Sequence, residues 1–193
     1  MKEMRKNKIV VIMILCVSLM FSNIMSIDVN AGAAFLGGVQ RVQQAKSNWC
    51  WAAGAEMVGA YKTTYPKDQW AIVGFIYGTS YPNVAGSISN VVSGVEYASN
   101  YTKDARSSAF ISLTSLTNEI SAKQHPVLIR IGWSNSNSGH VVVASGYNGS
   151  DIKIIDPWEN TATQYYTYSS LANGGTFANG TGTATHVVLY NNL

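Results

Sequence analysis

The chain has 193 residues, of which 47% are hydrophobic and only 12% are charged, and its formal net charge is +3. This length suits one domain once a leader has been removed. The composition excludes global disorder, because enough apolar residues are present to build a core. From Gly32 onward nine Lys and Arg residues stand against eight Asp and Glu residues, so we expect no basic patch and no nucleic-acid partner.

Residues 1–31 have the pattern of a secretory signal peptide. Met1–Lys8 is basic, and Ile9–Phe21 is an apolar run of thirteen residues, which is short for a membrane-spanning helix. Val29-Asn30-Ala31 provides small residues at a cleavage site. We therefore expect a signal peptide at 1–31, a mature domain at 32–193, a secreted protein and no membrane association after cleavage. The alternative is an uncleaved membrane anchor.

The cysteines become informative once the leader is set aside. Cys16 lies within residues 1–31, so Cys50 is the single cysteine of the predicted mature chain. A lone thiol in an exported protein is either buried as a small apolar residue, paired between chains, or used chemically. The residues around Cys50 favour chemical use.

Hydrophobic periodicity divides the mature chain into a helical first half and a strand-rich second half, with the change at His125-Pro126. Helices are predicted at Trp49–Tyr61, Lys67–Tyr77, Ser87–Ser99 and Thr114–Lys123. Strands are predicted at Val127–Trp133, His140–Tyr147, Ile152–Ile155, Gln164–Thr167 and Thr185–Tyr190, with loops at Asn135–Gly139, Asn148–Asp151 and Asn173–Gly182. This order predicts an α+β fold with a mostly antiparallel sheet.

Cys50 falls in the first turn of the first predicted helix, which Ser47 or Asn48 can cap. The unsatisfied N–H groups and the positive end of the helix dipole favour a thiolate there over a thiol. Gln44 lies six residues earlier, in the preceding loop. Its side-chain amide could join the backbone N–H of Cys50 in an oxyanion hole, although Gln44 taken alone would be interpreted as a surface residue.

His140 and Asp156 complete a candidate catalytic set. His140 opens an apolar strand, and Asp156 ends the next one, with Asn148-Gly149-Ser150 as the turn of a predicted hairpin. Paired strands would let Asp156 orient the His140 ring. A structural histidine and an Asp-Pro turn residue are the alternatives. His125 and His186 fit a structural role better than His140 does.

These residues, in this order, resemble the papain-like cysteine peptidases. The shared motifs are Gln44-x5-Cys50-Trp51, Gly139-His140 and Asp156-Pro157-Trp158, and the likeness extends from about Val39 to Tyr190. Short bacterial forms are the most similar, namely the double-glycine-leader peptidases and the effector proteases of plant pathogens. The third residue is Asp, as in the leader peptidases, where the papain branch proper usually has Asn.

The resemblance implies Cys50 as nucleophile, His140 as its partner, Asp156 as the orienting residue and Gln44 as oxyanion donor. It also implies a papain-like fold, in which a helical half carrying the cysteine packs against a sheet half carrying the histidine, with the cleft between them.

The function expected from these residues is hydrolysis of a peptide or isopeptide bond through a thioester on Cys50. The substrate would be a protein or peptide, the enzyme a monomer, and no metal or organic cofactor would be needed. Two alternatives stay open. The same Cys-His-Asp site could pass the acyl group to an amine, as in a transglutaminase, or deamidate a protein. The chain could also be a non-catalytic exported binding module.

Overall fold

An antiparallel sheet of eight strands organises residues 32–191, the part of the chain that the computed structural model describes. The predicted signal peptide lies outside these residues. Strand order along the sheet is β2-β8-β3-β4-β5-β6, while β1 pairs with β4 and β7 pairs with β8. The strands are β1 (Ala33–Phe35), β2 (Ala105–Ala109), β3 (Val127–Trp133), β4 (Gly139–Asn148), β5 (Asp151–Ile155), β6 (Gln164–Thr167), β7 (Gly175–Phe177) and β8 (Gly180–Tyr190).

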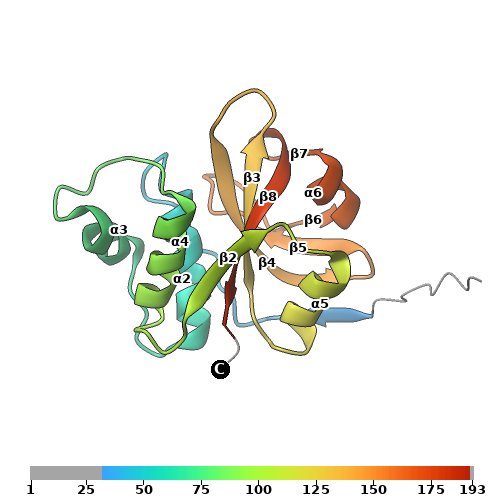
Figure 1. The fold of residues 1–193 in the computed structure, drawn as a ribbon, viewed down its shortest axis with the longest axis horizontal. Helices are drawn as coiled ribbons and strands as arrows, with labels where there is room; N and C mark the ends of the chain where they lie inside the picture. The colour runs from blue at the N-terminus through green and yellow to red at the C-terminus, as the bar shows by residue number, and fades with distance from the viewer. Residues whose placement is uncertain (1–31, 192–193) are drawn as a thin grey trace, which may run out of the picture. The chain divides into compact units, whose positions relative to one another are not determined.

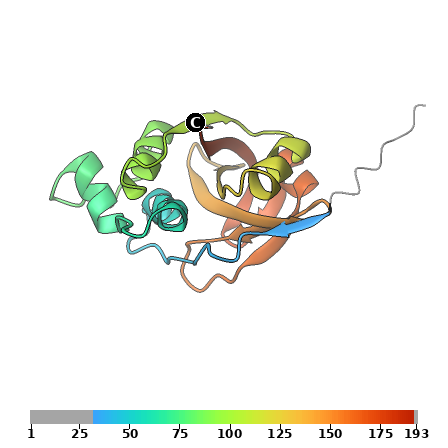
Figure 2. The same cartoon turned by 90° about the horizontal axis from the view of Figure 1, so that it is seen from below.

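The helices are α2 (Cys50–Lys62), α3 (Gln69–Tyr77), α4 (Ile88–Ala98), α5 (Leu113–Ser121) and α6 (Tyr168–Asn173). The first three gather beside the sheet, where α2 packs against β3 and β4, and α4 packs against β2 and β8 (Figure 1). The view from below shows α5 next to β1, on which it also packs (Figure 2). No helix within residues 32–191 is long and apolar enough to cross a membrane.

The predicted α+β order of helices followed by an antiparallel sheet is confirmed. Each predicted helix and strand is present, and the predicted hairpin joins β4 to β5, with Asn148 paired to Asp151. Gly149 occupies the turn with a φ of +60°, a left-handed conformation that glycine adopts without strain.

Three strands, β1, β2 and β7, and the short helix α6 were not predicted, and one predicted loop is partly sheet. β1 and β2 have the sequences AAF and ARSSA, which are poor in β-branched residues, so their pairing with β4 and β8 decides their conformation. The predicted loop Asn173–Gly182 contains β7 and the first residues of β8. Its glycines suppressed the strand signal, although Gly182 packs directly against the backbone of Gly132.

Close packing holds the helical half on the sheet, and two glycines of α2 make it possible. A Cβ on Gly54 would lie 2.6 Å from Leu128 Cδ2 and 3.2 Å from Val141 Cγ1, so the helix rests directly on β3 and β4. A Cβ on Gly59 would lie 2.4 Å from the Cβ of Ala98 in α4 and 2.7 Å from its carbonyl carbon. The helix that begins with Cys50 is therefore fixed to both the sheet and α4.

Gly59→Ala should lower the free energy of unfolding by about 1–3 kcal/mol, because α2 and α4 must separate to admit the methyl group. The sign of this change in the free energy of unfolding is diagnostic, because Gly→Ala inside a helix otherwise stabilises a protein by about 1 kcal/mol. Urea denaturation measures the change, with the exposed neighbour Ala60→Ser as control. A more stable Gly59→Ala protein would contradict this packing.

Candidate active site

Cys50 is the first residue of α2, and Trp49 occupies the N-cap position without a side-chain cap. The predicted capping by Ser47 or Asn48 is therefore wrong. Both side chains bind Asn83 instead: Asn83 Nδ2 donates to Ser47 Oγ at 2.9 Å, and Asn48 Nδ2 donates to the Asn83 carbonyl at 3.0 Å. Because the side chains of Ser47 and Asn48 are bonded to Asn83, neither caps the backbone N–H groups in the first turn of α2, beside Cys50.

The residues before and after Cys50 are buried tryptophans, and each one is anchored by a hydrogen bond. Trp49 Nε1 donates to the Pro82 carbonyl at 2.9 Å, and Trp51 Nε1 donates to the Val84 carbonyl at 3.3 Å. Both rings are at most 1% exposed, whereas Cys50 itself is half-buried. The half-buried Cys50 therefore lies between two residues whose side chains are packed in the core.

The His140 ring is buried at the start of β4 and is held from three directions. Its Nε2 lies 2.7 Å from Asp156 Oδ1. Trp133 stacks on the ring with centroids 6.0 Å apart, and Trp158 meets it edge-on at 6.1 Å. Since Nε2 faces Asp156, Nδ1 is the nitrogen left for the hydrogen bond with Cys50.

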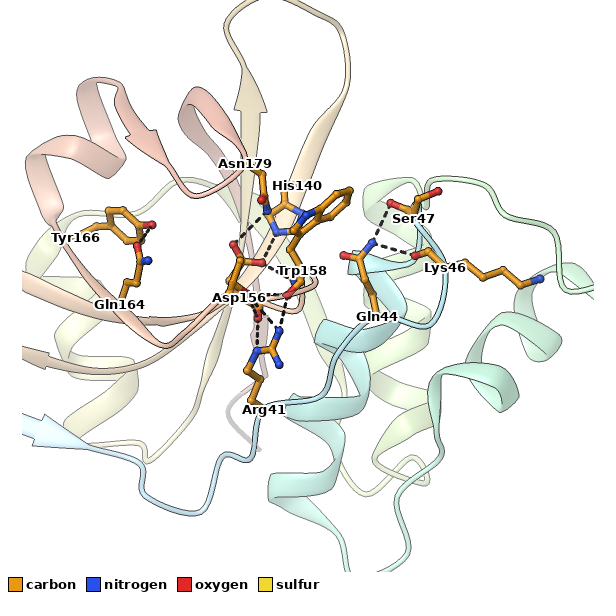
Figure 3. Close-up of polar contacts among 11 residues, drawn as sticks. Arg41, Gln44, Lys46, Ser47, His140, Asp156, Trp158, Gln164, Tyr166 and Asn179 are labelled. Carbon is orange, nitrogen blue, oxygen red and sulfur yellow. Dashed lines mark hydrogen bonds and ion pairs between the residues drawn. The ribbon is translucent and has the colours of Figure 1, made fainter.

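Asp156 follows β5 directly, and the residue is only 6% exposed. Besides His140, Oδ1 accepts the backbone N–H of Trp158 at 2.8 Å, and Oδ2 is 3.5 Å from Asn179 Nδ2. A buried carboxylate is costly unless its oxygens are satisfied, and these partners supply that compensation. The arrangement fits an Asp156 carboxylate that orients the His140 ring (Figure 3).

The charge on His140 follows from these contacts. Burial disfavours the protonated ring, but the hydrogen bonds to Asp156 and Cys50, together with the negative charges of both, raise the pKa of His140 from 6.5 to about 9. His140 is therefore an imidazolium at neutral pH. Beside a cysteine at a helix N-terminus, it favours a thiolate–imidazolium pair.

A strap formed by Arg41–Gln44 ties the two halves together at the site. Arg41 Nε donates to the Asp156 carbonyl at 2.8 Å, and its Nη2 donates to the Trp158 carbonyl and to Thr161 Oγ1. The backbone N–H of Gln44 donates to the Pro157 carbonyl at 2.8 Å. Figure 3 shows Asp156 between Arg41 and His140. No sequence signal pointed to Arg41, because its partners lie more than 100 residues away.

Gln44 is buried, at 8% exposure, so the surface interpretation is excluded. Its Nε2 donates to the carbonyls of Lys46 and Ser47, both at 2.9 Å. Its Oε1 is buried and, among residues 32–191, has no hydrogen-bond partner. In Figure 3 the amide nitrogen faces the Lys46–Ser47 loop and the oxygen points the other way. Both N–H groups are thus engaged, and the oxyanion role of Gln44 stays a prediction.

Two hollows border the catalytic set. One, of about 160 Å³, is lined by Cys50, Trp51 and Gly139, with Gly86 and residues of α4 opposite them. The other, of about 210 Å³, lies along Gln43–Ser47 and reaches Trp158 and Glu159. A substrate chain passing the thiol therefore finds room next to Cys50 and next to Trp158.

The remaining histidines are outside this set, as predicted. His125 Nδ1 lies 3.5 Å from Glu119 Oε2, and its ring packs edge-on against Tyr190. Burial, helped by the nearby Lys62, lowers the pKa of His125 despite the opposing effect of Glu119. His186 is exposed on β8.

Residues 37–180 match the family model described as the peptidase C39-like family. The chain belongs to this family. No curated protein sequence matches it. With the Cys50–His140–Asp156 geometry, the family identifies the chain as a cysteine-type peptidase, and the predicted papain-like α+β fold is confirmed.

Solved structures agree on the fold. A C39-like peptidase from Bacillus anthracis superposes with a TM-score of 0.53 at 13% identity, covering 83% of this chain and 98% of that one. A double glycine motif protease from an AMS/PCAT transporter, solved in complex with the leader peptide, superposes with a TM-score of 0.51 at 19% identity. That match covers 82% of this chain and 93% of the protease.

Replacing Asp156 by asparagine should lower the pKa of His140, because the negative neighbour is lost while a hydrogen-bond acceptor is kept. From about 9, we expect it to fall below about 8. NMR titration of the ring nitrogens measures the change. Asp151→Asn, which removes an exposed carboxylate at the other end of β5, is the control. An unchanged pKa in Asp156→Asn would show that Asp156 does not hold the charge on His140.

Proposed function

We propose that the protein hydrolyses peptide or isopeptide bonds in protein and peptide substrates through a thioester on Cys50. The observation that carries this proposal is the buried hydrogen bond of 2.7 Å between His140 Nε2 and Asp156 Oδ1, which leaves Nδ1 facing the cysteine. A thiol, an imidazole and an orienting carboxylate are the groups that covalent acyl transfer needs.

The proposed reaction has two steps. The Cys50 thiolate bonds to the carbonyl carbon of the scissile bond, and His140 gives its proton to the leaving amine nitrogen as the C–N bond breaks. Water then attacks the thioester, one of its protons passes to His140, and the C–S bond breaks. The acid product leaves, and the thiolate and the imidazolium are restored.

The oxyanion formed in each step would be stabilised by the backbone N–H of Cys50 and by the side chain of Gln44. Support comes from the uncapped start of α2 and from the burial of Gln44 next to the cleft. Gln44 must release one of its two bonds to the Lys46–Ser47 loop to donate. The two N–H groups of the Gln44 amide would therefore serve two purposes, bonding to the Lys46–Ser47 loop and stabilising the oxyanion.

We further propose that the enzyme is secreted and acts as a monomer. The support for secretion is the basic segment Met1–Lys8 followed by the apolar run Ile9–Phe21. N-terminal sequencing of the exported protein should find Gly32 or a close neighbour as the first residue. Full-length protein retained in a membrane fraction would contradict the proposed signal peptide.

Incubation with a peptide library, with the products identified by mass spectrometry, should reveal cleavage that Cys50→Ala and His140→Ala abolish. The exposed histidine variant His186→Ala should keep full activity and serves as the control. The same spectra distinguish hydrolysis from the alternatives, because deamidation adds about 1 Da and acyl transfer to an amine cross-links the substrates. Cleavage that survives in Cys50→Ala would refute the proposed nucleophile.

Gln44→Ala should lower kcat by roughly 10²-fold, about 2.7 kcal/mol, with little change in KM, if the amide stabilises the oxyanion. Thermal unfolding of the same variant measures its part in holding the loop. Gln43→Ala, at the exposed neighbouring position, is the matched control. An unchanged kcat in Gln44→Ala would place the oxyanion hole elsewhere.

A further inference from the structure

The hollow beside Cys50 carries one charged group on mostly apolar walls, which also include the polar residues Asn137 and Ser138. Its apolar walls come from Trp51 and from Ile88 and Val91, at the start of α4, with Val141 of β4 completing them. Arg130 of β3 lines the same hollow. A guanidinium in an apolar recess next to the candidate nucleophile is unusual, because charged groups rarely line apolar walls unless they have a partner.

Arg130 has no carboxylate partner within the described part of the chain, since none of the ion pairs there involves it. Its Nη1 donates to Thr185 Oγ1 at 2.9 Å, and its Nη2 donates to the Ser138 carbonyl at 3.2 Å. A guanidinium has five N–H donors, so these two neutral acceptors leave several donors free, and Arg130 is only half-buried, which leaves its charge open to a ligand.

The backbone is shaped to seat this guanidinium. Gly132 and Gly139 face each other across β3 and β4. A Cβ on Gly139 would lie 3.0 Å from both Cζ and Nη2 of Arg130, and a Cβ on Gly132 would lie 3.0 Å from Nη1. A Cβ on Gly139 would also lie 2.4 Å from the Ile131 carbonyl oxygen, and one on Gly132 would lie 2.9 Å from Thr185 Cγ2. The paired glycines therefore allow close packing at this point and leave the space in which the guanidinium lies against the strands.

We propose that this hollow binds a carboxylate side chain of the substrate, and that Arg130 is the residue that recognises it. The substrate class is therefore peptides with Asp or Glu close to the scissile bond. A carboxylate matches the planar fork of arginine and forms charge-assisted hydrogen bonds, which are strengthened where apolar walls exclude water. This inference rests on the proposed peptidase function and specifies the substrate of that same site.

The direct test compares matched peptides in which Asp is exchanged for Asn, or Glu for Gln, at each position on both sides of the cleaved bond. At one position the acidic peptide should be cleaved with a kcat/KM roughly 10- to 100-fold higher than its amide counterpart, the range expected for hydrogen bonds to a charged group. Peptides with amidated C-termini separate a side-chain carboxylate from a terminal one. Equal rates at every position would overturn the proposal.

Variants of Arg130 test whether this residue causes the preference for acidic peptides. Arg130→Gln should abolish the discrimination, Arg130→Lys should retain part of it, and Arg130→Glu should reverse it toward Lys and Arg peptides. Arg106→Gln is the matched control, because Arg106 is exposed on β2 and its register places it on the opposite face of the sheet. An acidic preference that persists in Arg130→Gln would overturn the assignment.

Failure of the proposed function gives a different result. If no peptide is cleaved by the unmodified protein under reducing conditions, the peptidase proposal fails. Rates of inactivation by peptidyl electrophiles with Asp or Asn at the scanned positions then still test the hollow, since they report binding next to Cys50 without hydrolysis. Faster inactivation by the Asp reagent, lost in Arg130→Gln, supports the role of Arg130, and equal rates contradict it.

Discussion

The hydrogen bond between His140 and Asp156 is the interaction on which the site depends. It lies below the surface at the end of the β4–β5 hairpin, and it determines which ring nitrogen meets Cys50. The antiparallel register of the hairpin brings residues 16 apart in sequence within 2.7 Å. Without this contact, burial would favour a neutral ring, because it removes water from the charged form.

The same pair connects the site to the rest of the fold. The Asp156 carboxylate is held by the N–H of Trp158, while the carbonyl of Asp156 accepts from Arg41. The strap Arg41–Gln44 then leads directly to the loop before Cys50, and Gly54 lets α2 rest on β3 and β4. The nucleophile and its base come from different halves of the molecule, so the strap and the close helix–sheet packing set the position of one relative to the other.

The sequence was sufficient for the α+β order, the hairpin and the pairing of His140 with Asp156, because each depends on local periodicity or on adjacent strands. The sequence was insufficient where the conformation or contacts of a residue depend on a partner far away in the chain. β2 forms because β8 pairs with it, Asn83 takes the side chains expected to cap α2, and Arg41 finds Asp156 across the fold. The seat of Arg130 depends on glycines paired between strands, and their roles appear only once the register is known.

Trapping the covalent intermediate tests the central claim most directly. A reaction quenched in acid within the first turnover and measured as intact protein should show a mass increase equal to the acyl part of the cleaved peptide. Fragmentation should place that mass on Cys50, and the adduct should disappear on treatment with hydroxylamine, which cleaves thioesters. Product formation with no adduct on Cys50, while Cys50→Ala still cleaves the same peptide, would contradict the account.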